Sequence, residues 1–106
     1  MTIEELRADL AEKLKIPAAL YGFRGGYIKS SALVLSATGE NAYKGNDANA
    51  ERLREIAIDL YISGAGDNLP NALITELERL RLPYRINTEV FESDTNLRHI
   101  EFITEI

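Results

Sequence analysis

The spacing of hydrophobic residues changes along this chain, and each change marks a predicted helix or strand. Helical spacing comes first, at Ile3, Leu6, Leu10 and Leu14. Thr2 and Glu5 match a capping box, in which each side chain accepts a hydrogen bond from a backbone amide at the helix start. Pro17 disfavours helical angles in the residue before it. The pattern predicts a helix that ends around Lys15 or Ile16.

Two runs in the middle of the chain predict paired strands. The run from Ser31 to Thr38 is short and apolar, and the run from Arg52 to Ile62 alternates with a period of two. The apolar side of the second run carries Ile56, Ile58, Leu60 and Ile62, and its other side carries Glu55, Ala57, Asp59 and Tyr61. Residues 39–50 are polar, with two glycines and three asparagines, and predict an exposed, flexible hairpin. Residues 17–30 predict a turn-rich connection that can contain a short strand.

The second half repeats the sequence of helix and then strands. Leucines at helical spacing (Leu69, Leu73, Leu77 and Leu80) predict a helix closed by Pro83, with Asp67 or Asn68 as its cap and Pro70 in its first turn. Alternating runs then predict two more strands, one led by Tyr84 and one ending at Ile106, with a turn at residues 93–96.

This order of elements predicts an α+β fold, and the 106 residues fit a single domain, 1–106. Neither helix is hydrophobic all round, so we expect a two-layer sandwich with both helices on one face of a mainly antiparallel sheet of about four strands. The other face is left uncovered. There Ala57 and Tyr61 lie with Glu55 and Asp59, a mixture that suits contact with a neighbouring protein.

Composition and charge exclude several classes of function. The chain has no cysteine, and its net charge of -5 belongs wholly to residues 51–106. This acidic half, in which arginine and glutamate are interleaved, argues against sequence-specific binding of nucleic acid. The acidic N-terminus does not resemble an export signal, and no apolar run is long enough for a membrane span. We expect a soluble, cytoplasmic protein without a membrane partner.

The candidate chemical motifs are each incomplete, and we expect neither a cofactor nor a metal. Gly64 and Gly66 before a helix resemble a phosphate cradle, but Leu69 replaces a third glycine and no P-loop lysine follows. The only histidine, His99, lies on the opposite side of its strand from Ile100 and Phe102. A solvent-facing or interface role explains it better than metal binding.

The acidic residues also fall short of a site. The run Asp47, Asn49, Glu51 has the character of a calcium loop, but Arg52 stands where the loop needs glycine. Carboxylates cluster at Glu4 with Glu5, Glu76 with Glu78, and Glu89 with Glu92, and we expect each of them on a solvated face. The sequence therefore predicts no catalytic residue.

Nearly the whole chain resembles the tail-terminator and head-tail joining proteins of long-tailed bacteriophages and prophages. The resemblance begins with an aliphatic-acidic-aliphatic-Tyr strand and a leucine-spaced helix. A Tyr-led strand that ends in Glu-Ser and a final strand with an acidic-aromatic pair follow. These features are Ile58, Asp59, Leu60 and Tyr61; Leu73, Leu77 and Leu80; Tyr84; Glu92 and Ser93; and Glu101 and Phe102.

The resemblance implies a structural protein of the virion that forms a ring, commonly of six subunits, assembled in the bacterial cytoplasm. The ring caps the finished tail tube and joins the tail to the head, so its partners would be its own copies, the tail tube protein and the head connector proteins. A ring needs side-to-side contacts between unlike surfaces. The hairpin and the uncovered face suit such contacts through Asn41, Tyr43, Lys44, Asn46, Asp47, Glu55, Ala57, Asp59 and Tyr61.

Two other functions remain open from the sequence. One is a small ligand-binding or enzymatic α+β domain that uses the glycine turn at residues 64–68. The other is a host adaptor module that binds a protein through the acidic surface. A thermal shift with nucleotides or phosphate would favour the first, and a gene outside any cluster of capsid and tail genes would favour the second.

Overall fold

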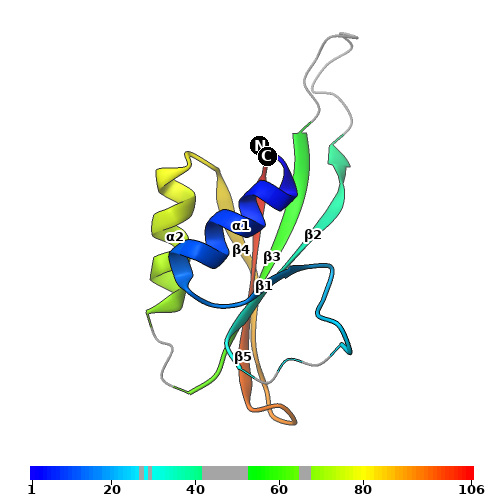
Figure 1. The fold of residues 1–106 in the computed structure, drawn as a ribbon, viewed down its shortest axis with the longest axis vertical. Helices are drawn as coiled ribbons and strands as arrows, with labels where there is room; N and C mark the ends of the chain where they lie inside the picture. Colours follow the sequence, from blue (N-terminus) through cyan, green and yellow to red (C-terminus); the bar gives the residue numbers. More distant parts are fainter. Residues whose placement is uncertain (27, 29, 42–52, 65–67) are drawn as a thin grey trace, which may run out of the picture.

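A computed structural model describes residues 1–26, 28, 30–41, 53–64 and 68–106 of the chain, with only the backbone at residues 39–41 and 53. It is an α+β fold with two helices and an open, five-stranded mixed sheet (Figure 1). The elements are α1 (Ile3–Leu14), β1 (Ala18–Leu20), β2 (Ala32–Asn41), β3 (Leu53–Ile62), α2 (Leu69–Arg79), β4 (Tyr84–Glu92) and β5 (Leu97–Glu105).

Helix α1 begins and ends as its sequence predicts. The capping box is formed: the Thr2 hydroxyl accepts a hydrogen bond from the Glu5 amide at 3.0 Å, and the Glu5 carboxylate accepts one from the Thr2 amide at 2.8 Å. The helix ends at Lys15, whose φ of 58° is left-handed. The buried residues of its apolar stripe are Leu6, Leu10 and Leu14.

Helix α2 follows the predicted leucine spacing and has Asn68, one of the two predicted cap residues, at its cap position. Pro70 lies in the first turn, as expected. Asn68 occupies the cap position in a helical conformation, and its side chain makes no capping hydrogen bond. The alternative cap, Asp67, lies outside the described residues. Cap side chains typically bond the free amides from an extended backbone, so the helical backbone of Asn68 explains why it occupies the predicted position without the capping bond.

The sheet has five strands in the order β1-β2-β3-β5-β4, one more than predicted. The additional strand, β1, is a short edge strand that runs parallel to β2, while the other neighbours are antiparallel. Hydrogen bonds from the Leu33 amide to the Pro17 carbonyl (2.9 Å) and from the Tyr21 amide to the Leu35 carbonyl (2.8 Å) hold it. Three residues are too few to show an alternation of apolar and polar positions, so the sequence could not distinguish this strand from the rest of the connection at residues 17–30.

The first strand of the central hairpin is longer than its sequence predicts. Residues 39–41 were expected in the hairpin loop, but β2 continues to Asn41, which pairs with Leu53. The pairing register shifts between Ala37 and Gly39, and the Thr38 hydroxyl there bonds to the Glu55 carboxylate at 2.8 Å. Such a bulge breaks the alternation of polar and apolar residues, which hides the end of the strand. The remainder of the predicted flexible hairpin lies outside the described residues.

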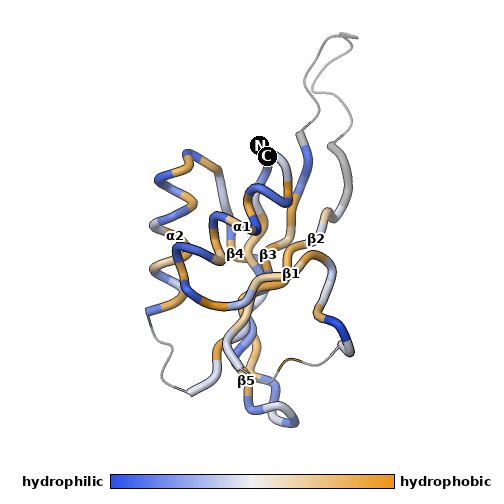
Figure 2. Tube along the Cα trace, in the orientation of Figure 1, coloured by the Kyte–Doolittle hydropathy of each residue, from blue (hydrophilic) through white to orange (hydrophobic). Residues whose placement is uncertain are grey.

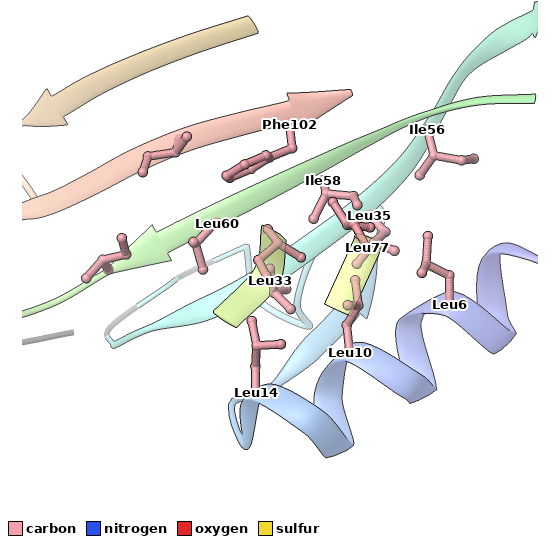
Figure 3. Close-up of a cluster of buried hydrophobic side chains, with 13 residues drawn as sticks. Leu6, Leu10, Leu14, Leu33, Leu35, Ile56, Ile58, Leu60, Leu77 and Phe102 are labelled. Atoms are coloured by element: carbon pink, nitrogen blue, oxygen red, sulfur yellow. The ribbon is translucent and has the colours of Figure 1, made fainter. Parts of the chain in front are cut away.

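Both helices pack on the same face of the sheet and bury one hydrophobic cluster (Figure 3). Along each helix hydrophobic and hydrophilic stretches alternate, as expected where one side is buried (Figure 2). The buried cluster comprises Leu6, Leu10, Leu14, Leu33, Leu35, Ile56, Ile58, Leu60, Ile62, Leu73, Leu77, Ile100 and Phe102. The predicted apolar side of β3 is therefore confirmed, and the opposite face of the sheet carries neither helix.

A polar contact that the sequence did not reveal links α1 to α2. Glu76, expected on a solvated face, is only 5% exposed and forms an ion pair with Arg79. Arg79 also donates to Asp9 of α1 at 3.1 Å. The helical period places Glu76 next to buried Leu77 and Leu73, and the approach of α1 then covers it.

The carboxyls of Asp9 and Glu76 have pKa values shifted in opposite directions. Burial, and then the neighbouring Glu76, raise the pKa of Asp9 to about 6. The hydrogen bond from Arg79 is the main cause that lowers the pKa of Glu76 to about 2. A proton held on Asp9 lets it donate to the Glu76 carboxylate, which satisfies an otherwise unpaired buried oxygen, Oδ2 of Asp9.

Replacing Asp9 with Asn tests this arrangement. The pKa of Asp9 is higher in the folded state than its usual 3.8. The stabilisation that protonated Asp9 gives to the fold is therefore fully present below pH 3.8 and is lost as the pH rises through about 6. Asn donates at every pH, so Asp9→Asn should be more stable than wild type at pH 7 and should lose this part of the pH dependence. Thermal melts between pH 4 and pH 7 measure it, with exposed Asp94→Asn as the matched control. Parallel curves for wild type and Asp9→Asn would contradict the assignment.

Candidate functional site

The face of the sheet that has neither described helix packed on it, which we call the outer face, brings together the predicted contact residues of β3. Glu55, Ala57, Asp59 and Tyr61 alternate with the buried isoleucines and leucine and therefore point away from the helices. Ala57 is only 2% exposed, so in the described structure it offers almost no surface to a partner. Asn41 pairs with Leu53 at the end of the hairpin strands, while Tyr43, Lys44, Asn46 and Asp47 lie outside the described residues.

Strand β5 completes the outer face with residues that the sequence reasoning did not assign to it. The antiparallel register sets Glu101 opposite Asp59, His99 opposite Tyr61, and Ile103 opposite Ala57. Alternation within each strand predicted which side each residue faces, and His99 does lie on the side away from Ile100 and Phe102. The residues that lie opposite each other on neighbouring strands depend on which strands pair, and the alternation within one strand does not predict the pairing.

The centre of the outer face is a cluster formed by Asp59, Tyr61 and His99. The Nε2 atom of His99 lies 2.7 Å from Oδ1 of Asp59, and both side chains are more than four-fifths buried. The Tyr61 ring stacks on the His99 ring, with centroids 4.3 Å apart and planes 16° apart. Glu92 lies on the other side of the imidazole, 4.0 Å from Nδ1. The histidine is thus held in one orientation by three neighbours.

Burial and nearby carboxylates shift the pKa values of this cluster. Burial is the main cause that raises the pKa of Asp59; the hydrogen bond from His99 lowers it, and the neighbouring Glu101 raises it. The pKa of the Tyr61 hydroxyl is raised as well, first by burial and then by Asp59. Tyr61 is therefore kept as a neutral phenol, which can donate a hydrogen bond to a partner.

The rim of the outer face is charged and shallow. Arg85 of β4 lies 3.6 Å from the Glu55 carboxylate, and Asn87 donates to Glu101 at 2.7 Å. A small depression beside Tyr61 is lined by Gly26, Ile28, Tyr61, Glu92, Thr95 and Leu97. Among the described residues, no three His, Asp or Glu side chains are grouped to hold a metal ion. An ordered, largely acidic surface of this kind suits binding of a protein through its side chains.

The glycine turn singled out in the sequence is described only at its two ends. Gly64, after β3, has a left-handed φ of 61°, and Asn68 stands at the start of α2. Gly66 and Asp67 lie outside the described residues. The phosphate-cradle alternative therefore stays a prediction.

Comparison with known protein families and with curated proteins finds no match for this sequence. Within the described ranges, neither helix has the length and apolar character required to cross a membrane. The resemblance to tail-terminator proteins therefore rests only on the sequence features of residues 58–102 named above.

The cluster predicts two opposite changes in the pKa of Asp59. His99→Ala removes the hydrogen bond that lowers this pKa, so the pKa should rise further. Glu101→Gln removes a neighbouring charge that raises it, so the pKa should fall. Titration of the Asp59 carboxyl carbon by NMR measures both. Equal values in the two variants would contradict the described contacts.

Proposed function

We propose that this chain is a structural subunit of a phage or prophage tail, which caps the tail tube as a ring and joins the tail to the head. The resemblance described above supports this role, and the fold gives it a surface. The single observation that carries the proposal is the outer face: a sheet face without a helix over it in the described structure, whose central polar side chains are already bonded to one another.

Fixed side chains lower the cost of binding. Asp59, His99 and Tyr61 hold their positions through mutual contacts, so little side-chain freedom remains to be lost when a partner covers them. Tyrosine is also among the residues enriched at protein interfaces, where its ring packs and its hydroxyl bonds. The outer face is therefore prepared for a protein surface.

The charge of the outer face defines the partner surface. Asp59 and Glu101 are opposite each other on neighbouring strands, and Glu55 lies further along β3 on the same face. The basic partners of these carboxylates are His99, beside Asp59, and Arg85, beside Glu55. A complementary partner surface is basic, which speeds encounter and aligns the two proteins. In a ring each subunit presents this face to an unlike surface of its neighbour or of the tail tube.

Reversing one charge on the outer face tests the role. Glu55 is about one-third exposed, so Glu55→Lys should fold and yet reduce attachment to tail tubes by roughly tenfold, equivalent to about 1.4 kcal/mol. Glu12→Lys, an exposed change of the same type on α1, serves as the matched control. Electron microscopy of tail tubes mixed with each variant counts capped ends. Equal capping by both variants would exclude the outer face, and no capping by wild type would exclude the tail role.

The hairpin expected to assist assembly has its own test. Replacing residues 41–48 with a short Gly-Ser linker should preserve the melting temperature, because this run is mostly polar in sequence and the buried cluster described above is formed by residues of α1, β2, β3, α2 and β5. Attachment to tail tubes should be lost. Unchanged capping would refute a role for the hairpin.

A further inference from the structure

Strand β4 is a long, exposed edge of the sheet. It lies at one end of the strand order, and eight of its nine residues are exposed. Four of them are large hydrophobic residues: Tyr84 (37% exposed), Ile86 (52%), Val90 (49%) and Phe91 (63%). Edge strands offer unpaired backbone groups, and an apolar edge of this length invites another strand.

A bulge in β4 changes which face of the sheet each side chain lies on before and after it. The register with β5 shifts between Ile86 and Thr88, so Asn87 is an additional residue. On the helix side of the sheet β4 therefore presents Tyr84, Ile86, Glu89 and Phe91, and on the outer face it presents Arg85, Thr88, Val90 and Glu92.

We propose that the β4 strands of two copies of this chain pair antiparallel, about a two-fold axis at Glu89, and form a dimer. A two-fold axis perpendicular to the sheet keeps each residue on its own face, so only residues of the same face can be opposite each other. With the axis at Glu89, Arg85 is opposite Glu92 on the outer face. Ile86 is then opposite Phe91 on the helix side.

Both pairs are complementary, and the symmetry forms each of them twice. Arg85 is 58% exposed and Glu92 36% exposed, so a second copy can reach both charges, although Arg85 also lies 3.6 Å from Glu55 of its own chain. Ile86 and Phe91 would bury apolar surface that is open to water in the single chain. Because one strand carries both members of the opposite-charge pair and both members of the apolar pair, the partner that fits this edge is a second copy of the chain.

The charge at the axis is already compensated. Glu89 would meet Glu89 of the second copy, but each accepts a hydrogen bond from its own Arg98 at 3.0 Å. The axis therefore gathers two carboxylates and two guanidinium groups, with no net charge. Two neighbouring registers also respect the faces. An axis at Thr88 would place Ile86 opposite Glu89 and Arg85 opposite Val90, and an axis at Val90 would place Glu89 opposite Phe91 and Thr88 opposite Glu92. Both registers lose the two complementary pairs.

This dimer stands on β4 alone and does not require the tail role. It closes the exposed β4 edge of each copy and leaves no further β4 edge to extend, so pairing through this strand stops at two copies. The outer face of β3 remains outside the strand contact.

A charge swap tests the pairing. Arg85→Glu sets two like charges opposite each other twice, so the dimer dissociation constant should rise by roughly tenfold or more. The double variant Arg85→Glu, Glu92→Arg restores opposite charges and should recover the dimer. Arg24→Glu, exposed in the loop after β1, is the matched control and should dimerise as wild type does. Sedimentation velocity over a dilution series measures all four, and circular dichroism checks that each variant is folded.

Engineered cysteines test the register. Residues directly opposite in antiparallel strands have Cα atoms about 4.5–5.5 Å apart, within the reach of a disulfide. Glu89→Cys should therefore give a covalent dimer on mild oxidation, and Thr88→Cys should not. A wild-type chain that stays monomeric or forms large aggregates would overturn the proposal. So would a double variant as weak as Arg85→Glu, or a disulfide at Thr88→Cys and not at Glu89→Cys.

Discussion

The antiparallel pairing of β3 with β5 is the constraint on which the rest of this structure depends. On one face it sets Ile58 opposite Phe102 and Leu60 opposite Ile100, which form the floor of the buried cluster. On the other face the same register sets Tyr61 opposite His99. A shift of one residue would turn both sets of side chains to the wrong face, so the core and the outer face are specified together.

Each face uses this register in a different way. The helix side is closed by α1 and α2, which cover it with leucines and are themselves joined through Asp9, Glu76 and Arg79. Among the described residues no helix packs on the outer face, and hydrogen bonds and ring stacking order its own side chains. The first arrangement stabilises the fold, and the second fixes the side chains of the surface for which we propose the assembly role.

The sequence predicted what depends on periodicity and missed what depends on pairing. Helical spacing at Leu6, Leu10 and Leu14, and again at Leu73 and Leu77, predicted both helices. A short apolar run predicted β2, and alternation predicted β3, β4 and β5. Strand β1 was too short for a period. The bulge near Thr38 hid the end of β2. Contacts between residues that are distant in the sequence, such as Asp59 with His99 and Asp9 with Glu76, leave no signal in a local pattern. The nearest hint is that Asp59 stands between Ile58 and Leu60, and that Glu76 stands beside Leu77.

The outer face was predicted at its β3 residues only, because no local signal joins β3 to β5. The claim at the centre of this account is that this face is an assembly surface. Electron cryomicroscopy of a tail that contains the protein tests it most directly. The account predicts a ring at the head-proximal end of the tube, with Asp59, Tyr61 and His99 buried against a neighbouring subunit or the tube. A ring whose outer face lies open to solvent, or a tail end without this chain, would contradict it.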